Sequence, residues 1–148
     1  MASLSEIKAF LDNTISNPNF ESLKSLQHWY QETTLDNWQN KVTFEDASYK
    51  RISLIKSHYY DLLLLCWKPG QKSPIHGHPK QGCLVKIMEG NLSDEITTPN
   101  QQITANTYFQ NDVLYIADNV GQHRVFNISD KNVVSLHLYA PGGYTPDM

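Results

Sequence analysis

The sequence has few cysteines and no excess of positive charge. Its 148 residues include two cysteines, too few for the disulfide framework that stabilises small secreted domains. Twelve lysines and arginines stand against fifteen aspartates and glutamates, which gives a net charge of −3. Binding to nucleic acid or to an anionic membrane depends on basic patches, and the sequence contains no polybasic run. We therefore expect neither nucleic acid nor a membrane as a partner.

The sequence also lacks a hydrophobic run that could cross a bilayer. The longest apolar run extends from Leu62 to Trp67, whereas a membrane-spanning helix needs roughly 20 apolar residues. Residues 1–13 carry Glu6 early and have no basic segment followed by an apolar core, so they do not match a signal peptide. We expect a cytoplasmic protein.

What remains is an ordinary globular composition, with 40% apolar and 18% charged residues. The length fits one domain, so we expect a single domain over residues 1–148. The first forty residues predict helices. Ser3 or Ser5 can cap a first helix, a second is predicted over 20–33 after the break at residues 17–19, and a weak turn follows at 35–38. The apolar positions of the first helix are Leu4, Ile7, Phe10 and Leu11.

From residue 42 onward, short β-branched and aromatic segments alternate with turn residues. The predicted strands are Val42–Glu45, Tyr49–Ile55, Tyr59–Trp67, Gly82–Met88, Asn91–Thr97, Gln101–Asn106, Asp112–Ala117, His123–Asn127 and Val133–Tyr139. Nine strands without helices between them favour a mainly β fold, an antiparallel barrel or sandwich. We expect helices over residues 1–40 to pack on a barrel over residues 41–148.

Six histidines are present, and two of them, His76 and His78, are separated by one residue. In a strand these imidazoles would point to the same face and could bind one metal ion. Such a pair alone is more often two exposed histidines than a metal site. The wider spacing changes this interpretation, because G-x5-H-x-H-x4-C-x6-G extends from Gly70 to Gly90 and a Gly-x-His-x3-Asn string ends at Asn127.

These two strings resemble the two motifs of the cupin superfamily, which consists of small antiparallel barrels with a metal in the mouth. Cys83 stands where the first cupin motif has a glutamate ligand. The resemblance therefore leaves three neutral ligands, His76, His78 and His123. A divalent metal with neutral ligands keeps more of its charge and attracts an anionic substrate such as a thiolate.

A narrower resemblance joins several segments in order between residues 49 and 141. They are Leu-Cys-Trp at 65–67, the two motifs above, Glu-Gly-Asn-Leu at 89–92, His-Arg-Val-x-Asn at 123–127 and Ser-Leu-His-Leu-Tyr-x-Pro at 135–141. Together they are similar to thiol dioxygenases of the cysteine dioxygenase type. Longer members of this family continue beyond the last segment with further strands that help to close the site. The resemblance therefore does not tell us which residues form the far wall of the site in this chain.

The resemblance implies a role for each matching residue. The three histidines would bind Fe(2+), while Cys83 and Tyr139 match a pair that can form a thioether crosslink. His137 would hold the tyrosine hydroxyl. Tyr49 and Arg51 match an element whose arginine pairs with the substrate carboxylate, a ligand that suits the guanidinium fork.

The activity implied is the oxidation of L-cysteine by O2 to cysteine sulfinic acid in a monomer or small homo-oligomer. Two alternatives stay open: a dioxygenase for 3-mercaptopropionate or another small thiol, and a cupin that binds a metal without catalysis. Among the remaining residues, Cys66 is expected in the core, His28 and His58 on the surface, and Arg124 in a structural ion pair.

Overall fold

The fold consists of an N-terminal helical region followed by two antiparallel sheets, in a computed structural model that describes residues 2–117 and 122–143. The helical elements are α1 (Leu4–Ile15), η1 (Leu23–Leu26), α2 (Gln27–Glu32) and η2 (Trp38–Lys41), where η marks a 3-10 helix. The strands are β1 (Lys50–Lys56), β2 (Asp61–Trp67), β3 (Cys83–Glu89), β4 (Asn91–Thr97), β5 (Ile103–Phe109), β6 (Val113–Ile116), β7 (Gln122–Phe126) and β8 (Val133–Tyr139).

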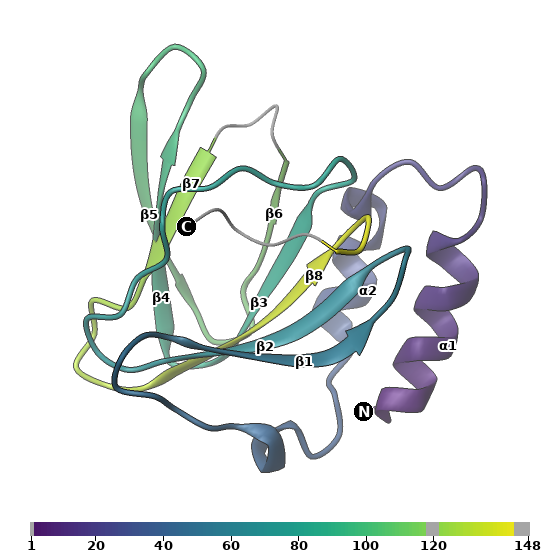
Figure 1. The fold of residues 1–148 in the computed structure, drawn as a ribbon, viewed down its shortest axis with the longest axis horizontal. Coiled ribbons are helices and arrows are strands. Elements are labelled where there is room, and N and C mark those ends of the chain that lie inside the picture. The colour runs from purple at the N-terminus through teal and green to yellow at the C-terminus, as the bar shows by residue number, and fades with distance from the viewer. Residues whose placement is uncertain (1, 118–121, 144–148) are drawn as a thin grey trace.

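The strands form two sheets, and every pairing between the strands above is antiparallel. One sheet has the order β1-β2-β8-β3-β6 and the other the order β5-β4-β7. The helices α1 and α2 cover one face of the five-stranded sheet, and the three-stranded sheet lies on its other side (Figure 1). The mainly β, antiparallel prediction is confirmed. In the described residues, the strands are divided between two sheets instead of pairing around one continuous ring.

Strand β2, which lies between β1 and β8, is buried on both faces, which explains its apolar sequence from Leu62 to Trp67. Side chains that face the helices are Leu62, Leu64 and Cys66. Side chains that face the three-stranded sheet are Leu63, Leu65 and Trp67. The prediction that Cys66 belongs to the core is therefore confirmed. The same alternation divides β3 and β8 between a helix-side core and an inner core.

The first helix begins as predicted. Ser3 caps α1 and forms a capping box with Glu6, which satisfies two of the backbone donors at the helix start. The second helical segment begins at Leu23 and not at residue 20, because the Ser22 side chain accepts from the Lys24 amide and caps it there. Its first part is a 3-10 helix, and α2 continues from Gln27.

The predicted strand Val42–Glu45 is wrong. The amide of Val42 donates to the carbonyl of Gln39, and the carbonyl of Glu45 accepts from the side chain of Gln71. Backbone groups of this segment are thus satisfied outside any ladder, while Val42 and Phe44 pack against the helix-side core. The other eight strands are confirmed close to their predicted positions, and β4 and β8 have the predicted bounds.

A buried lysine ties the end of α2 to the five-stranded sheet. Lys86 of β3 is 2% exposed, and its Nζ donates to the carbonyls of Tyr30, Gln31 and Thr33 at 3.4, 2.8 and 2.8 Å. The last carbonyls of a helix have no partner within the helix, so the ammonium satisfies groups that would otherwise be unpaired. Burial lowers the pKa of Lys86.

We predict that Lys86→Met lowers the free energy of unfolding by about 2–4 kcal/mol, since it removes charged hydrogen bonds and leaves buried carbonyls unpaired. Denaturant unfolding followed by circular dichroism measures the change. Lys80→Met is the matched control, because Lys80 is exposed. Equal effects of the two substitutions would contradict this account.

Candidate metal centre

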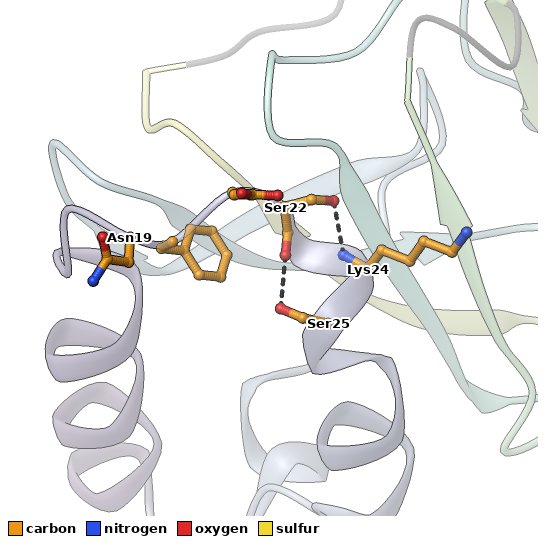
Figure 2. A pocket seen from close by; sticks show the side chains of 6 residues that line it. Asn19, Ser22, Lys24 and Ser25 are labelled. Atoms are coloured by element: carbon orange, nitrogen blue, oxygen red, sulfur yellow. Dashed lines mark hydrogen bonds between the residues drawn. The ribbon is translucent and has the colours of Figure 1, made fainter.

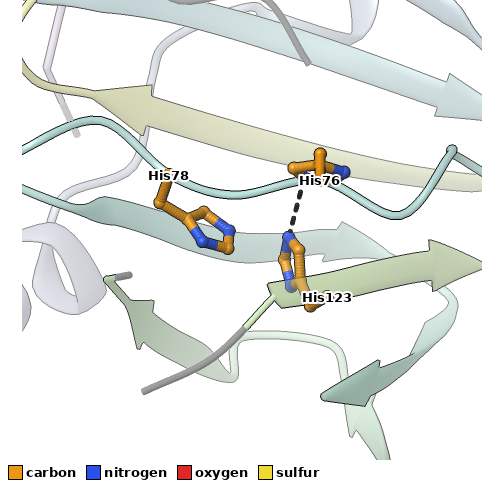
Figure 3. Close-up of side chains that lie close together, drawn as sticks. All are labelled: His76, His78 and His123. Carbon is orange, nitrogen blue, oxygen red and sulfur yellow. Dashed lines mark hydrogen bonds between the residues drawn. The ribbon is translucent and has the colours of Figure 1, made fainter. Parts of the chain in front are cut away.

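The site begins with a backbone contact between two segments that lie far apart in the sequence. The amide of His76 donates to the carbonyl of His123 at 2.9 Å, and the amide of His123 donates to the carbonyl of His76 at 3.0 Å. His76 and His78 come from the segment that precedes β3, whereas His123 belongs to β7. This isolated bridge brings the three imidazoles together (Figure 3).

The three imidazoles have the spacing that one metal ion requires. One ring nitrogen from each of them lies within 4.8 Å of the others, and the Nε2 atoms of His76 and His123 are 2.9 Å apart. Metal–nitrogen bonds of about 2.1 Å place neighbouring ligand nitrogens roughly 3 Å apart at a right angle. The three side chains are 3–5% exposed. Together they fit a single metal ion held by three buried imidazoles.

His76 and His123 are in the neutral form that binds metal. Nδ1 of His76 lies 2.8 Å from the carbonyl oxygen of Pro74, which can only accept, so this nitrogen carries the proton and Nε2 keeps its lone pair. Burial lowers the pKa of His76, and burial, followed by the proximity of His76, lowers the pKa of His123 to about 3. A metal ion therefore displaces few protons at neutral pH.

A hydrogen-bonded row extends along the inner face of β8. The indole Nε1 of Trp67 donates to Oγ of Ser135 at 3.0 Å, and this hydroxyl lies 2.7 Å from Nε2 of His137. Nδ1 of His137 lies 3.3 Å from the hydroxyl of Tyr139. Ser135, His137 and Tyr139 share one face because they are two residues apart in a strand. The row fixes the position of the tyrosine hydroxyl.

Sequence reasoning included His137 and Tyr139 in the site but missed Ser135 and the role of Trp67. The signal was present for Ser135, which shares the strand face of the other two. Trp67 gave no such signal, because its contact with Ser135 depends on how β2 pairs with β8.

Cys83 lies directly opposite Tyr139 in the pairing of β3 with β8. Both side chains belong to the inner core, and they are 1% and 2% exposed. Burial raises the pKa of the Cys83 thiol, while a hydrogen bond with Tyr139 and the charge of Arg51 oppose this rise. The structure thus brings together the two residues that were predicted to form a crosslinking pair.

Arg51 faces the same interior from β1. Its register partner is Leu65, an inner-core residue, and its charge lowers the pKa of both His76 and His137. Nη1 of Arg51 is buried and has no hydrogen-bond partner among the described residues. A buried donor without a partner is costly, so this nitrogen is suited to an anionic ligand.

Tyr49, predicted beside Arg51, stacks on the indole of Trp67 with ring centroids 4.4 Å apart and an interplanar angle of 17°. This stacking supports the same tryptophan that donates to Ser135. Tyr49 therefore contacts the row of hydrogen bonds from the β1 side.

Sequence reasoning also missed Asp94. This aspartate on β4 is 1% exposed, and its Oδ2 lies 3.8 Å from Nδ1 of His123. An acid at the centre of the inward-facing row Leu92, Asp94 and Ile96 is unusual, and this pattern could have identified it.

The expectations for the other charged and polar residues are confirmed. His28 and His58 are exposed, and Arg124 forms an ion pair with Glu95 across the β4–β7 pair.

A surface hollow between α1 and α2 lies apart from the metal centre (Figure 2). Its lining residues are Asn19, Phe20, Glu21, Ser22, Lys24 and Ser25. The hydroxyl of Ser22 accepts from the Lys24 amide, and its carbonyl accepts from Ser25, so these groups satisfy one another.

In the described part of the chain, every helix is too short or too polar to traverse a bilayer.

Comparisons with known proteins agree with this arrangement. A family model described as cysteine dioxygenase type I matches residues 3–145. Cysteine dioxygenase type 1 of Danio rerio is 31% identical over 133 residues, and that of Homo sapiens is 30% identical over 136 residues. Each match covers 83% of this chain and 66% of the relative, so the chain spans slightly less than two thirds of these relatives.

Solved structures support the cupin fold. A Klebsiella pneumoniae protein with a double-stranded β-helix domain superposes with a TM-score of 0.64 at 13% identity, covering 79% of this chain and all of that one. Bacillus subtilis oxalate decarboxylase superposes with a TM-score of 0.60 at 19% identity, covering 72% of this chain and 29% of that one. The cupin fold that the sequence motifs implied is thus confirmed.

We predict that the metal-free protein binds one divalent ion per chain. His123→Ala should weaken this binding at least about 100-fold, since loss of a metal ligand lowers the affinity more than loss of an outer group that only contacts a ligand. Anaerobic titration with Fe2+ against a chelator measures the affinity. His28→Ala is the control, because His28 is exposed and far from the group in sequence. Full binding by His123→Ala would refute the site.

Proposed function

The chain belongs to the cysteine dioxygenase type I family, and on this premise we propose that it is an iron(II)-dependent thiol dioxygenase that converts L-cysteine into cysteine sulfinic acid. One observation carries the proposal: three buried imidazoles face the same interior as the guanidinium of Arg51, whose Nη1 is buried and has no partner among the described residues. The first group suits a metal that attracts a thiolate, and the second suits a carboxylate. Cysteine has both groups on one small molecule.

The reaction proposed is thiol plus dioxygen giving sulfinic acid, with both oxygen atoms transferred to sulfur. Iron(II), when held by His76, His78 and His123, would supply the one-electron chemistry that allows dioxygen to react with a thiolate. The three histidines add no negative charge, so the metal ion would keep its positive charge and would strongly attract the anionic sulfur of the thiolate. The protein's own contribution is to bind and orient the substrate.

Arg51 would hold the substrate carboxylate through its buried Nη1. Tyr139 would direct its hydroxyl at the reacting groups, because His137 holds that hydroxyl from one side. The contact of Ser135 with the other ring nitrogen of His137 restricts the imidazole, and Trp67 in turn restricts Ser135. A thioether bond between Cys83 and Tyr139 would lock the tyrosine further, since the two residues are cross-strand neighbours.

A second substrate, 3-mercaptopropionate, is favoured by the same guanidinium, because this thiol also carries a carboxylate. The partners proposed are thus a small thiol and dioxygen. The protein that binds them is proposed to be a monomer or small homo-oligomer. We place the protein in the cytoplasm, where thiols stay reduced. A metal-binding cupin without catalysis is the outcome expected if no thiol supports oxygen uptake.

We expect the iron-reconstituted protein to consume oxygen with cysteine and to form cysteine sulfinic acid. Oxygen uptake is measured with cysteine, 3-mercaptopropionate and cysteamine, and the products are identified by mass spectrometry. Faster turnover of 3-mercaptopropionate would reassign the substrate. Stoichiometric iron without oxygen uptake for any thiol would defeat the proposed activity.

Arg51→Ala is expected to raise KM for cysteine roughly 100-fold, because it removes a charge-assisted pair with the carboxylate. Activity with cysteamine, which has no carboxylate, should change far less. Lys50→Ala is the matched control, since Lys50 is the preceding residue and pairs with Glu45 outside the inner core. Equal losses with cysteine and cysteamine would show that Arg51 does not bind the carboxylate.

The thioether bond between Cys83 and Tyr139 would produce two bands on a denaturing gel, one for the crosslinked form and one for the open form. Cys83→Ser should leave a single band. Cys66→Ser is the control, because Cys66 faces the helix side of β2. A doublet that persists in Cys83→Ser would exclude this bond.

A further inference from the structure

We infer that Asp94 is a positioning residue of the metal centre, whose carboxylate lies behind His123, orients its imidazole and supplies negative charge that the three ligands do not. This inference rests on the proposed function only in taking the three histidines to hold a metal ion. It concerns a residue that lies one layer outside the ligands and contacts no substrate.

The pairing of β4 with β7 places the carboxylate behind this ligand. Asp94 is opposite Val125, the next inward-facing residue after His123 on β7. The two sides of the His123 ring therefore face different groups. Its Nε2 lies 2.9 Å from Nε2 of His76, and its Nδ1 lies 3.8 Å from Oδ2 of Asp94. A ligand imidazole with a carboxylate behind its second nitrogen is a recurring arrangement in metal sites.

The contrast with His76 shows why His123 needs such a partner. Nδ1 of His76 is fixed by the carbonyl of Pro74 at 2.8 Å, whereas Nδ1 of His123 has no hydrogen bond among the described residues. When Nε2 binds a metal, the ring proton resides on Nδ1. The carboxylate of Asp94 faces this nitrogen, and because the His123 ring is neutral the contact is one between a charge and a polar ring. At 3.8 Å the contact is electrostatic and longer than a hydrogen bond.

The surroundings of Asp94 make its charge effective. Asp94 lines a small apolar cavity inside the fold. The other residues lining this cavity are Val85, Ile87, Leu92, Ser93, Tyr108, Leu114, His123 and Val125. Both carboxylate oxygens of Asp94 are buried and have no hydrogen-bond partner among the described residues. A buried acid without a cation is costly, and a metal ion beyond His123 would offset that cost.

A purely structural role makes a different prediction. A carboxylate that only supported the packing of β4 would alter the stability of the metal-free protein and leave the affinity of the folded protein for metal unchanged. A carboxylate that acts through His123 would alter metal affinity and the spectrum of the bound ion. The experiment must therefore report on the metal directly, without relying on thiol oxidation.

The test titrates the metal-free full chain with Co2+ in competition with a chelator and records the visible absorption of the bound ion. We expect Asp94→Asn to bind Co2+ about 10–100-fold more weakly and with a shifted spectrum. Asp94→Glu, which keeps the charge, should recover part of the affinity. Glu95→Gln is the matched control, because Glu95 is the next residue on β4, points to the outer face and pairs with Arg124. Its affinity should equal that of the wild type.

A second measurement needs no variant. In the Zn2+-loaded wild type, the Nδ1 proton of His123 should appear in 15N-edited NMR spectra as a slowly exchanging, downfield resonance. The inference is overturned if Asp94→Asn binds Co2+ as tightly as the wild type, or if this proton exchanges rapidly. Co2+ binding that depends on Asp94, together with no oxygen uptake by the iron form, would instead overturn the proposed function and leave this inference standing.

Discussion

The site depends on a series of backbone hydrogen bonds between residues 70–76 and residues 123–127. They join His76 to His123 and attach the segment before β3 to the edge of β7. Without these contacts, the two motifs that supply the histidines would belong to separate parts of the fold, because β3 lies in the five-stranded sheet and β7 in the three-stranded sheet. The backbone holds Nε2 of His76 and Nε2 of His123 within hydrogen-bond distance, 2.9 Å apart, and a metal ion would replace the contact between these two nitrogens.

The helices contribute indirectly to this site. Because α1 and α2 cover the outer face of the five-stranded sheet, its strands β2, β3 and β8 are buried on both sides. The helix-side core stabilises the sheet mainly with apolar residues, Lys86 being the charged exception, and the inner face accommodates further buried polar groups. Arg51 and His137 lie on that inner face, and Asp94 faces it from β4 of the three-stranded sheet; each buried polar atom would be unfavourable in isolation. The stability of the fold and the chemistry of the site are thus assigned to opposite faces of the same strands.

The parts that could be predicted from the sequence are those determined by local spacing. The three histidines, Cys83 and Tyr139 lie in motifs of fixed length, and alternation along one strand placed His137 beside Tyr139. Strand pairing between distant segments is not encoded in this way. The contact of Trp67 with Ser135 requires the β2–β8 register, and the position of Asp94 behind His123 requires the β4–β7 register. Residues 42–45 resembled a strand because they are β-branched and aromatic, but their backbone groups bond to a turn and a side chain.

The distribution of charge around the three histidines follows from these registers. A guanidinium lies on the β1 side and a carboxylate on the β4 side, and the histidines lie between them, with His76 and His123 neutral. A cation beside the site favours an anionic substrate, whereas an anion behind a ligand favours the metal ion itself. If Asp94 stood where Arg51 stands, it would repel a substrate carboxylate, and an arginine behind His123 would repel the metal. The opposite placement of the two charges therefore suits one site to a cation held by the histidines and to an anionic ligand beside it.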